Sequence, residues 1–362
     1  GLVSARTALP ALPLSAQTSN EIDARIDAVD PQSIAMILYT SGTTANPKGC
    51  LIRHRGIIGN SRNLGRRYEM QPGDRFWSPL PIFHIAGILP LVSILDIGGT
   101  YLTIPNFDAG VALSMLETEK ATHAYPCFVT IMQDLIEHPK FTETDLSSVR
   151  LMNANLGVQP DWIRDSMVKA MPHTIMVGTY GLTEGSGTIC TSRMTDPWEA
   201  RGWRLGVPLD EWEVQILDIE TGNICGVDEQ GEIIARGPNM LAGYYNAPEK
   251  TAAVIDADGW FHTGDVGRFF KGNLQITDRI KNMLVNAYGK NIYPTPVENT
   301  YLKSPKVEQV FLIGDKQEYI TAILVPSRES LQDEFKLSDD FFNAPETFII
   351  LSSFNSTGIK YD

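Results

Sequence analysis

Cysteine is scarce in this chain of 362 residues. The four cysteines are Cys50, Cys127, Cys190 and Cys225, and they form no Cys-x-x-Cys pair, which excludes a cysteine zinc knuckle. A disulfide framework is not expected, because a chain of this length builds its core without cross-links. We therefore interpret the cysteines as reduced thiols of a cytoplasmic protein, buried as small apolar residues.

Basic residues are fewer than acidic residues, and the chain has no long apolar run. The chain has 30 basic and 43 acidic residues and a formal net charge of -13. This balance argues against attraction of the whole surface to nucleic acid or to an anionic membrane. The most apolar run, Ile85–Leu95, is too short to span a bilayer and ends at Asp96. We expect it to form a buried helix that leads into a strand, and we expect no membrane span.

The chain has no internal repeat and no low-complexity tract, and its composition is that of a globular protein of two or three domains. Strand-like and helix-like segments alternate through its first half. Strands are expected over residues 33–39, 100–104, 124–128 and 148–156, the first of them short and buried, and helices are expected over residues 109–120, 129–137 and 161–170. This alternation favours a sheet of mainly parallel strands covered by helices.

The pattern changes after Thr188 to short strands between Gly and Asp turns, for example over residues 213–217 and 232–235. A third region begins near Lys281, with strands expected over residues 283–286, 307–313 and 320–325 and a helix over 295–302. The sequence thus predicts an α/β protein with two domains. Residues 1–280 form a large domain of mixed, mainly parallel sheets with helices and a β-rich subdomain, and residues 281–362 form a small α+β domain.

One segment has the composition of a phosphate-binding loop. Leu38–Gly49 reads LYTSGTTANPKG, a strand followed by small hydroxyl residues around a glycine and then a lysine. Backbone N–H groups and hydroxyls of this kind can surround phosphate oxygens while Lys48 neutralises their charge. The segment is not a Walker loop, because Lys48 is followed by Gly49. By itself, it is also compatible with a solvated Ser/Thr turn.

Further segments follow this loop in a specific order. They are PLPIFHIAGI from Pro79, GTYGLTEGSG from Gly178, GEIIARGPNMLAGYYNAPEKT from Gly231, DGWFHTGDVG from Asp258 and TDRIKNMLVNAYGKNIYPTPVEN from Thr277. With YTSGTTANPKG, they resemble the signature motifs of the adenylate-forming (AMP-binding) superfamily, and most of all its acyl-CoA synthetases, the fatty-acid–CoA ligases. The resemblance extends from Ile37 to Pro326, and several such motifs in order are far more specific than any one of them.

The resemblance implies an acid–thiol ligase with ATP, Mg²⁺ and CoA as cofactors and co-substrates. A carboxylate would attack the α-phosphorus of ATP, and a thiol would then displace AMP from the acyl-adenylate. The residues implied to hold the phosphates are Thr40, Ser41, Gly42, Thr43, Thr44 and Lys48. Tyr180 would stack on adenine, Thr183 would contact the α-phosphate, and Glu184 would hold Mg²⁺, which prefers oxygen ligands.

Four more residues take roles from the resemblance. Asp265 would accept the ribose hydroxyls, Arg279 would contact the ribose or phosphate, and His84 would gate the acyl pocket. Taken without their motifs, these residues are equally compatible with ordinary salt bridges and a buried histidine. Lys281 occupies the family's hinge position, about which the small domain rotates between the two half-reactions.

The sequence also departs from the family pattern. Asp278 stands where a glycine is usual, Asn282 stands where an acidic residue is usual, and Asn153–Leu156 replaces a Gly-Gly-Ala loop. The catalytic lysine of the family matches Lys360 only with an inserted Ile359. The segment before Thr40 is shorter than the family's N-terminal lobe, so we expect that lobe to be incomplete.

The FHIAG segment indicates the class of acid. Relatives that activate amino acids place an aspartate there, because a buried ammonium group needs a counterion. Here the segment has no carboxylate, which favours a fatty or other non-amino acid as the substrate. Two alternatives stay open: an adenylation domain that loads an acyl-carrier protein, and a nucleotide-binding remnant without catalysis.

Overall fold

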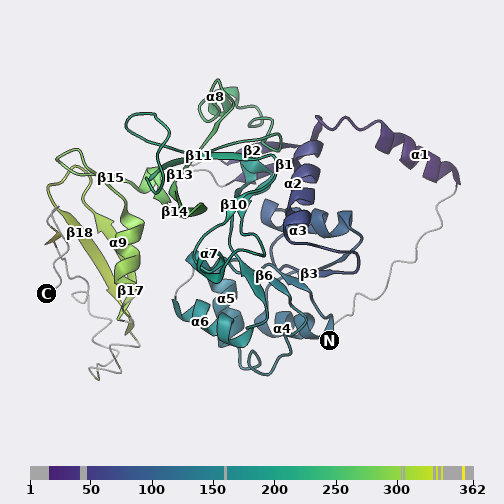
Figure 1. The fold of residues 1–362 in the computed structure, drawn as a ribbon, viewed down its shortest axis with the longest axis horizontal. Helices are drawn as coiled ribbons and strands as arrows, with labels where there is room; N and C mark the ends of the chain where they lie inside the picture. The colour runs from purple at the N-terminus through teal and green to yellow at the C-terminus, as the bar shows by residue number, and fades with distance from the viewer. Residues whose placement is uncertain are drawn as a thin grey trace.

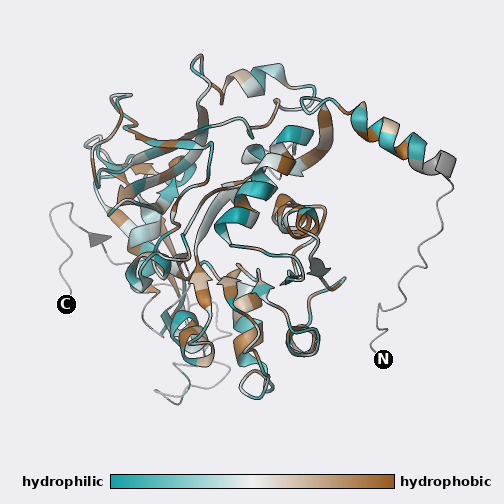
Figure 2. Ribbon diagram, turned by 45° about the vertical axis from the view of Figure 1, so that its right-hand side comes forward, coloured by the Kyte–Doolittle hydropathy of each residue, from teal (hydrophilic) through white to brown (hydrophobic). Residues whose placement is uncertain are grey.

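The computed structural model describes residues 16–40, 47–158, 161–302, 304, 306–328, 332, 336 and 353–354. Figure 1 shows a large body and, at one end of it, a smaller C-terminal unit that contains α9, β17 and β18. Helix α1 (Ala16–Asp27) projects from the opposite side of the body in both ribbon views (Figures 1 and 2).

A parallel sheet forms the centre of the large body, with the strand order β4-β3-β5-β6-β7. Its strands are β3 (Arg75–Trp77), β4 (Thr100–Leu102), β5 (His123–Ala124), β6 (Leu151–Asn153) and β7 (Ile175–Val177). The helices between successive strands are α3 (Ile85–Asp96), α4 (Ala109–Thr118), α5 (Val129–Glu137) and α6 (Asp161–Ala170). The α/β class predicted from the strand–helix alternation is therefore confirmed.

Both faces of this sheet are buried, as is usual for parallel sheets. Adjacent side chains of a strand point to opposite faces, so Phe76 and Trp77 belong to two different cores. Phe76 packs with residues of α2 (His54–Arg67) and α3, whereas Trp77 packs with residues of α4, α5 and α6. The apolar run Ile85–Leu95 forms helix α3 as expected, with one face buried and Leu95 exposed. Across the described residues, no helix is both long enough and apolar enough to cross a membrane.

Two strand predictions were wrong in their extent. The strand predicted over 124–128 consists of only His123–Ala124, and the chain then turns at Cys127, whose φ is 37°. The strand predicted over 148–156 consists of only Leu151–Asn153, and Asn155, two residues after its end, adopts a left-handed conformation with φ 46°. By contrast, the helices predicted over 129–137 and 161–170 have those bounds.

The strand predicted over 33–39 is present as β1 (Ile34–Thr40), but the prediction that it is buried was wrong. It pairs antiparallel with β2 (Lys48–Arg53) in a separate hairpin, where Thr40 lies opposite Lys48. The side chains of Ile34, Ile37 and Tyr39 are exposed. A short apolar run predicts a strand but does not say which elements cover it.

Two antiparallel sheets lie between the parallel sheet and the C-terminal unit in the sequence. One has the order β10-β9-β8 and the other the order β11-β12-β13-β14. Their strands are β8 (Thr179–Leu182), β9 (Gly187–Thr191), β10 (Val207–Pro208), β11 (Glu213–Leu217), β12 (Gly231–Arg236), β13 (Phe261–Phe270) and β14 (Asn273–Arg279). This arrangement confirms the predicted β-rich subdomain, and the β13–β14 register sets Asp265 opposite Arg279.

The C-terminal unit has the predicted mixture of a helix and strands. It contains β15 (Leu284–Val285), β16 (Asn291–Ile292), α9 (Pro294–Tyr301), β17 (Val307–Ile313), β18 (Ile320–Pro326) and β19 (Ser353–Phe354). Its small core includes Leu312, Ile320 and Ala322. The remaining short elements of the chain are η1 (Leu156–Val158), η2 (Thr183–Gly185), α7 (Trp198–Arg201), α8 (Pro248–Ala252) and η3 (Ile280–Asn282).

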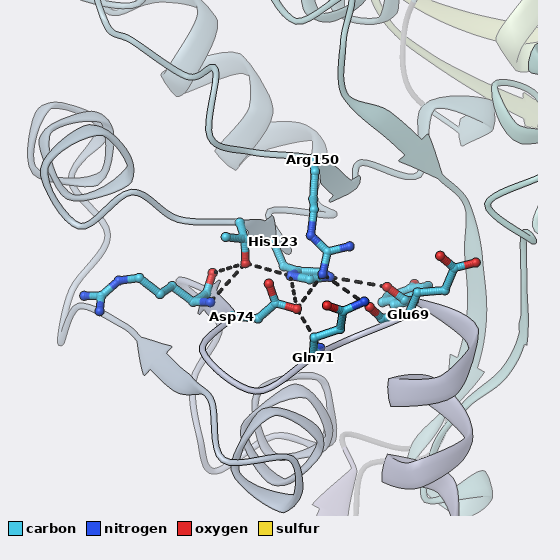
Figure 3. Close-up of polar contacts among 8 residues, drawn as sticks. Glu69, Gln71, Asp74, His123 and Arg150 are labelled. Carbon is cyan, nitrogen blue, oxygen red and sulfur yellow. Dashed lines mark hydrogen bonds and ion pairs between the residues drawn. The ribbon is translucent and has the colours of Figure 1, made fainter.

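A polar cluster lies at the amino-terminal ends of three strands of the parallel sheet (Figure 3). Asp74 precedes β3, His123 begins β5 and Arg150 precedes β6. Arg150 forms an ion pair with Asp74 Oδ2, and His123 Nδ1 lies 3.9 Å from the same oxygen. Burial, together with the positive charge of Arg150, lowers the pKa of His123 to about 4. At neutral pH the ring is therefore uncharged, and the cluster ties the strand ends together.

Candidate active site

Three of the predicted nucleotide-binding residues meet between β8 and the β11–β14 sheet. The phenol of Tyr180 donates a hydrogen bond to Asp265 Oδ2 at 2.8 Å, and Arg279 Nε lies 2.9 Å from Asp265 Oδ1. Tyr180 and Asp265 are buried, whereas the Arg279 side chain is 55% exposed. The structure thus brings together one aromatic ring, one carboxylate and one guanidinium from three separate motifs.

The ionisation of this group follows from its burial. Burial raises the pKa of Asp265 above its usual value, while Arg279 and the Tyr180 hydroxyl act in the opposite direction. Burial and the neighbouring Asp265 raise the pKa of Tyr180 well above its usual value. Tyr180 therefore keeps its proton and remains a hydrogen-bond donor. The charge of Glu184 also raises the pKa of Asp265, so the two carboxylates belong to one electrostatic site.

A second group forms around Glu184, which lies in η2 next to the buried Thr183. Glu184 Oε1 accepts a hydrogen bond of 2.8 Å from the hydroxyl of Tyr244. The ammonium group of Lys48 lies over the same ring, 4.9 Å from its centroid. Burial, and then the nearby Glu184 charge, raise the pKa of the Cys50 thiol. Glu184, the predicted metal ligand, and Lys48, the predicted phosphate lysine, thus both contact Tyr244.

The ends of the predicted phosphate loop are fixed by the β1–β2 hairpin. Thr40 is the last residue of β1, and Lys48 is the first residue of β2. Ser41, Gly42, Thr43 and Thr44 lie outside the described residues, and so does Lys360. The hairpin places Lys48 against the ring of Tyr244, whose hydroxyl bonds to Glu184.

The segment Asn153–Leu156, which departs from the family pattern, supports the strand that carries Tyr180. Asn153 Nδ2 donates to Thr179 Oγ1 at 2.8 Å, and the backbone N–H of Thr179 donates to Asn155 Oδ1 at 2.6 Å. Both asparagines therefore hold Thr179, the residue before Tyr180. These two hydrogen bonds hold the first residue of β8 in place.

His84 lies at the carboxyl-terminal side of β3, where it caps helix α3. Its Nδ1 accepts a hydrogen bond from the backbone N–H of Ala86 at 3.2 Å, and partial burial lowers the pKa of His84. The loop passes so close to the helix that a Cβ on Gly87 would collide with the carbonyl oxygen of Pro81. Phe83 beside it is 80% exposed. In open α/β sheets, ligands bind at this end of the strands.

The predicted hinge is anchored by Asp278, which the sequence singled out as a departure. Lys281 lies in η3 directly after β14. The carboxylate of Asp278 accepts hydrogen bonds from the backbone N–H groups of Arg279 at 2.7 Å and Thr295 at 2.9 Å, and from Asn282 Nδ2 at 3.2 Å. One buried side chain thus joins the end of the large body to the first turn of α9.

The charges of the site suit a metal–phosphate complex. Among the residues that the structure describes, no group of three or more His, Cys, Asp or Glu side chains is arranged to hold a metal ion. Glu184 and Asp265 are the acidic residues of the site, and Lys48 and Arg279 are its cations. Mg²⁺ commonly binds through one or two carboxylates plus phosphate oxygens, so this donor set fits Mg²⁺ bound together with a nucleotide.

Comparison with known proteins identifies the family. Residues 2–245 match the family model described as AMP-binding enzyme, and residues 281–349 match the model of the AMP-binding enzyme C-terminal domain. The chain belongs to the AMP-binding enzyme family. The resemblance inferred from its motifs is confirmed.

Curated relatives of this AMP-binding enzyme include CoA ligases. It is 36% identical over 297 residues to 3-[(3aS,4S,7aS)-7a-methyl-1,5-dioxo-octahydro-1H-inden-4-yl]propanoyl:CoA ligase of Mycobacterium tuberculosis, covering 81% of this chain and 56% of that protein. It is 32% identical over 290 residues to a mitochondrial medium-chain acyl-CoA ligase of Mus musculus, covering 78% of this chain and 47% of that protein. The chain spans about half the length of the curated relatives it matches.

Solved structures of AMP-binding enzymes share the fold. O-succinylbenzoate coenzyme A synthetase of Bacillus subtilis in complex with AMP matches with a TM-score of 0.72 and 28% identity, covering 85% of this chain and 63% of that one. The same synthetase in complex with ATP and a magnesium ion matches with a TM-score of 0.71 and 26% identity, covering 86% and 65%. Both likenesses agree with the α/β class and the small C-terminal unit described above.

Sequence reasoning missed the part played by Tyr244. The motif resemblance includes the GYYN segment but gives neither of its tyrosines a role. The available signal was weak, because two adjacent tyrosines follow Gly243 and only the fold shows which of them turns inward. Tyr244 is 5% exposed and Tyr245 is 48% exposed.

Proposed function

We propose that this AMP-binding enzyme activates a carboxylic acid with ATP and transfers the acyl group to CoA. In the first step, a carboxylate oxygen forms a bond to the α-phosphorus, and pyrophosphate leaves with the electron pair of the broken P–O bond. In the second step, the CoA sulfur bonds to the acyl carbon, AMP leaves, and the thiol proton passes to solvent. The observation that carries this proposal is the Tyr180–Asp265–Arg279 group beside the Glu184–Tyr244–Lys48 group.

The first of these groups is suited to the nucleoside. A carboxylate oxygen can accept more than one hydrogen bond, so Asp265 retains capacity for the ribose hydroxyls beside its present partners. Tyr180 offers a ring for adenine, and the exposed Arg279 can follow the ribose or the phosphate. Thr183, which directly precedes Glu184 in η2, is assigned to the α-phosphate by the motif resemblance.

The second group is suited to the phosphates. The reacting groups are all anions, so catalysis depends mostly on positioning and on neutralising charge. Lys48, with Thr40, Ser41, Gly42, Thr43 and Thr44, is assigned to the β- and γ-phosphates. Glu184 is assigned to Mg²⁺, which would draw the phosphate oxygens together and offset their charge. Lys360 is assigned as the lysine that approaches the attacking carboxylate.

The acid is proposed to be a fatty or other non-amino acid. His84 and Phe83 lie at the carboxyl end of the parallel sheet, and no acidic residue occurs between Phe83 and Leu95 to pair with an ammonium group. The named relatives that act on medium-chain acids and on an indene-propanoyl acid support this class. His84 is assigned as the residue at the mouth of the acyl pocket.

The two half-reactions are proposed to use the division of the chain at Lys281. Residues 1–280 would hold ATP and the acid, and residues 281–362 would rotate about Lys281 to admit the thiol. A cytoplasmic location is part of the proposal, because all four cysteines are free thiols and both ATP and CoA are available in the cytoplasm. An acyl-carrier protein in place of CoA is tested as the alternative acceptor.

The test is pyrophosphate release from ATP in the presence of a panel of straight-chain, aromatic and amino acids, each with and without CoA. We expect release that depends on a non-amino acid, followed by AMP and an acyl-CoA product seen by mass spectrometry. Thioester formation only with a phosphopantetheinyl carrier protein would replace CoA as the acceptor. Tight AMP binding without release for any acid would overturn the catalytic proposal in favour of a nucleotide-binding remnant.

A further inference from the structure

Tyr244 is held in place by the backbone of β2, the strand that begins with Lys48. Residues 242–245 run alongside β2, with an antiparallel bridge between Tyr244 and Cys50. The backbone hydrogen bonds are Ala242 N to Leu51 O at 2.8 Å, Leu51 N to Gly243 O at 3.0 Å and Tyr245 N to Gly49 O at 2.7 Å. Tyr244 N also donates to Thr251 Oγ1 at 2.9 Å. These bonds fix Tyr244 opposite Cys50, which lies two residues after Lys48 in β2.

From this position the side chain contacts two charges of opposite sign. Its hydroxyl donates to Glu184 Oε1 at 2.8 Å, and its face lies 4.9 Å from the Lys48 ammonium group. A hydrogen bond to a charged acceptor is stronger than one between neutral groups, and a cation–π contact is stronger when it is buried than when it is exposed. Burial raises the pKa of Tyr244, so the phenol stays protonated and remains the donor of this hydrogen bond.

We propose that Tyr244 is a positioning residue that orients Glu184 and keeps Lys48 beside it, so that metal and phosphate meet a site already assembled. This inference rests on the proposed function, in which Glu184 serves Mg²⁺ and Lys48 serves the β- and γ-phosphates. Outer-shell partners of metal-binding carboxylates act in this way, and their loss weakens metal affinity about 10- to 100-fold. Tyr244 reaches the reaction only through these two side chains.

The variants Tyr244→Phe and Tyr244→Leu separate its two contacts. Tyr244→Phe removes the hydroxyl but keeps the ring, so only the orientation of Glu184 is lost. Tyr244→Leu also removes the ring face that Lys48 covers. Tyr245→Phe is the matched control, because it removes the hydroxyl of the adjacent, more exposed tyrosine.

The measurement is calorimetric binding of AMP without metal and of ATP at increasing Mg²⁺. We expect Tyr244→Phe to raise the Mg²⁺ midpoint for ATP binding by about 10-fold or more, with AMP affinity changed less than about twofold. Tyr244→Leu should weaken ATP binding further and again spare AMP, which lacks the phosphates that Lys48 serves. Tyr245→Phe should match the wild type in both titrations.

A cycle with Glu184→Gln tests whether the effect passes through the carboxylate. If Tyr244 acts by orienting Glu184, the double variant should have a Mg²⁺ midpoint no higher than that of Glu184→Gln alone. Additive losses, or equal losses for AMP and for Mg²⁺-dependent ATP binding, would reduce Tyr244 to a packing residue and overturn the inference. If the wild type and Tyr244→Phe bind Mg²⁺–ATP equally well, the inference about Tyr244 is overturned but the proposed function is not. If the wild type binds neither ATP nor AMP, both the inference and the proposed function are overturned.

Discussion

At the scale of single residues, Asp265 is the central side chain of the proposed nucleotide site. It accepts from Tyr180, pairs with Arg279 and is 7% exposed. A buried carboxylate in this setting loses much of its hydration, and it is compensated by a phenol and a guanidinium. Removing it affects the ligand and also leaves its two partners without their acceptor.

We predict that Asp265→Ala weakens binding of AMP and ATP by about 10- to 100-fold. Loss of a charge-assisted hydrogen bond costs about 1.5–3 kcal/mol, which corresponds to this range. Calorimetry of the folded variant measures the change. Glu213→Ala is a matched control, because Glu213 pairs with Arg236 across β11 and β12 as Asp265 pairs with Arg279 across β13 and β14. Equal nucleotide affinity in Asp265→Ala and the control would remove Asp265 from the site.

At the scale of elements, the parallel sheet is tied at its amino-terminal ends by the Asp74–His123–Arg150 cluster (Figure 3). The His123 ring is stacked on Phe76, with the centroids 5.7 Å apart, and Thr122 Oγ1 lies 3.0 Å from its Nδ1. Burial raises the pKa of Asp74, but the backbone N–H of Gln71 and the positive charge of Arg150 outweigh burial, so the pKa of Asp74 is lowered. The cluster therefore holds one carboxylate and one guanidinium as ions around a neutral imidazole.

We predict that folding stability rises with pH between about 4 and 6.5. The pKa of His123 is about 4 in the folded chain against 6.5 for the free side chain, so the unfolded chain binds the extra proton in this window. The contribution of neutral His123 is fully present above pH 6.5 and is lost as pH falls toward 4. The difference is worth about 3 kcal/mol at 1.36 kcal/mol per pH unit.

The measurement is the midpoint of thermal unfolding against pH for the wild type and for His123→Gln. The variant keeps a polar group on β5 but cannot titrate, so its curve should be flatter between pH 4 and 6.5. Substitution of His173, a surface-side histidine bonded to the carbonyl of Leu146, should leave the slope in place. Parallel curves for the wild type and His123→Gln would mean that another group causes the dependence.

A second element-scale prediction concerns the junction between β14 and α9. The carboxylate of Asp278 accepts from the backbone N–H of Thr295 in the first turn of α9. We predict that Asp278→Ala speeds hydrogen exchange at Thr295 by about 10- to 100-fold, because loss of an acceptor for this amide costs about 1.5–3 kcal/mol of local stability. Asp315→Ala removes a comparable carboxylate acceptor, that of Val285 N, and should leave Thr295 unchanged. Unchanged exchange at Thr295 in Asp278→Ala would show that α9 is held by other contacts.

At the scale of the whole molecule, the chain joins a large body to a small C-terminal unit through the segment around Lys281 (Figure 1). The side chains of Asp278 and of Asn291, whose Nδ2 donates to Glu220 Oε1 at 2.9 Å, link the two parts. Among the described residues, polar contacts of this kind suit an interface that the proposed reaction cycle would remake. The proposed alternation between two half-reactions depends on such a change.

We predict that Lys360→Ala slows acyl-adenylate formation by about 100-fold or more, the size typical of one lost electrostatic stabiliser. The second half-reaction, started from preformed acyl-adenylate and CoA, should proceed at nearly the wild-type rate. Single-turnover assays of each step measure the two effects. If both steps slow together, or neither changes, Lys360 is not the catalytic lysine.

The sequence by itself determined the class, the family and the order of the motifs. Helices such as α5 and α6 could be predicted to the residue, because their apolar periodicity and flanking residues are local properties. Tyr180, Asp265 and Arg279 could also be predicted as nucleotide residues on local grounds, since each lies in a motif whose residue types suit such a ligand, and these roles stay a prediction.

Tertiary structure alone decided which of these residues meet and what covers them. The pairing of Asp265 with Arg279 depends on the β13–β14 register, and the contact of Tyr244 with Glu184 and Lys48 depends on the backbone pairing of residues 242–245 with β2. The exposure of β1 likewise depends on neighbours that are distant in the chain. Periodicity records which side of an element is apolar, but contacts between distant segments arise only when the chain folds, and for this reason Tyr244 could not be found from the sequence.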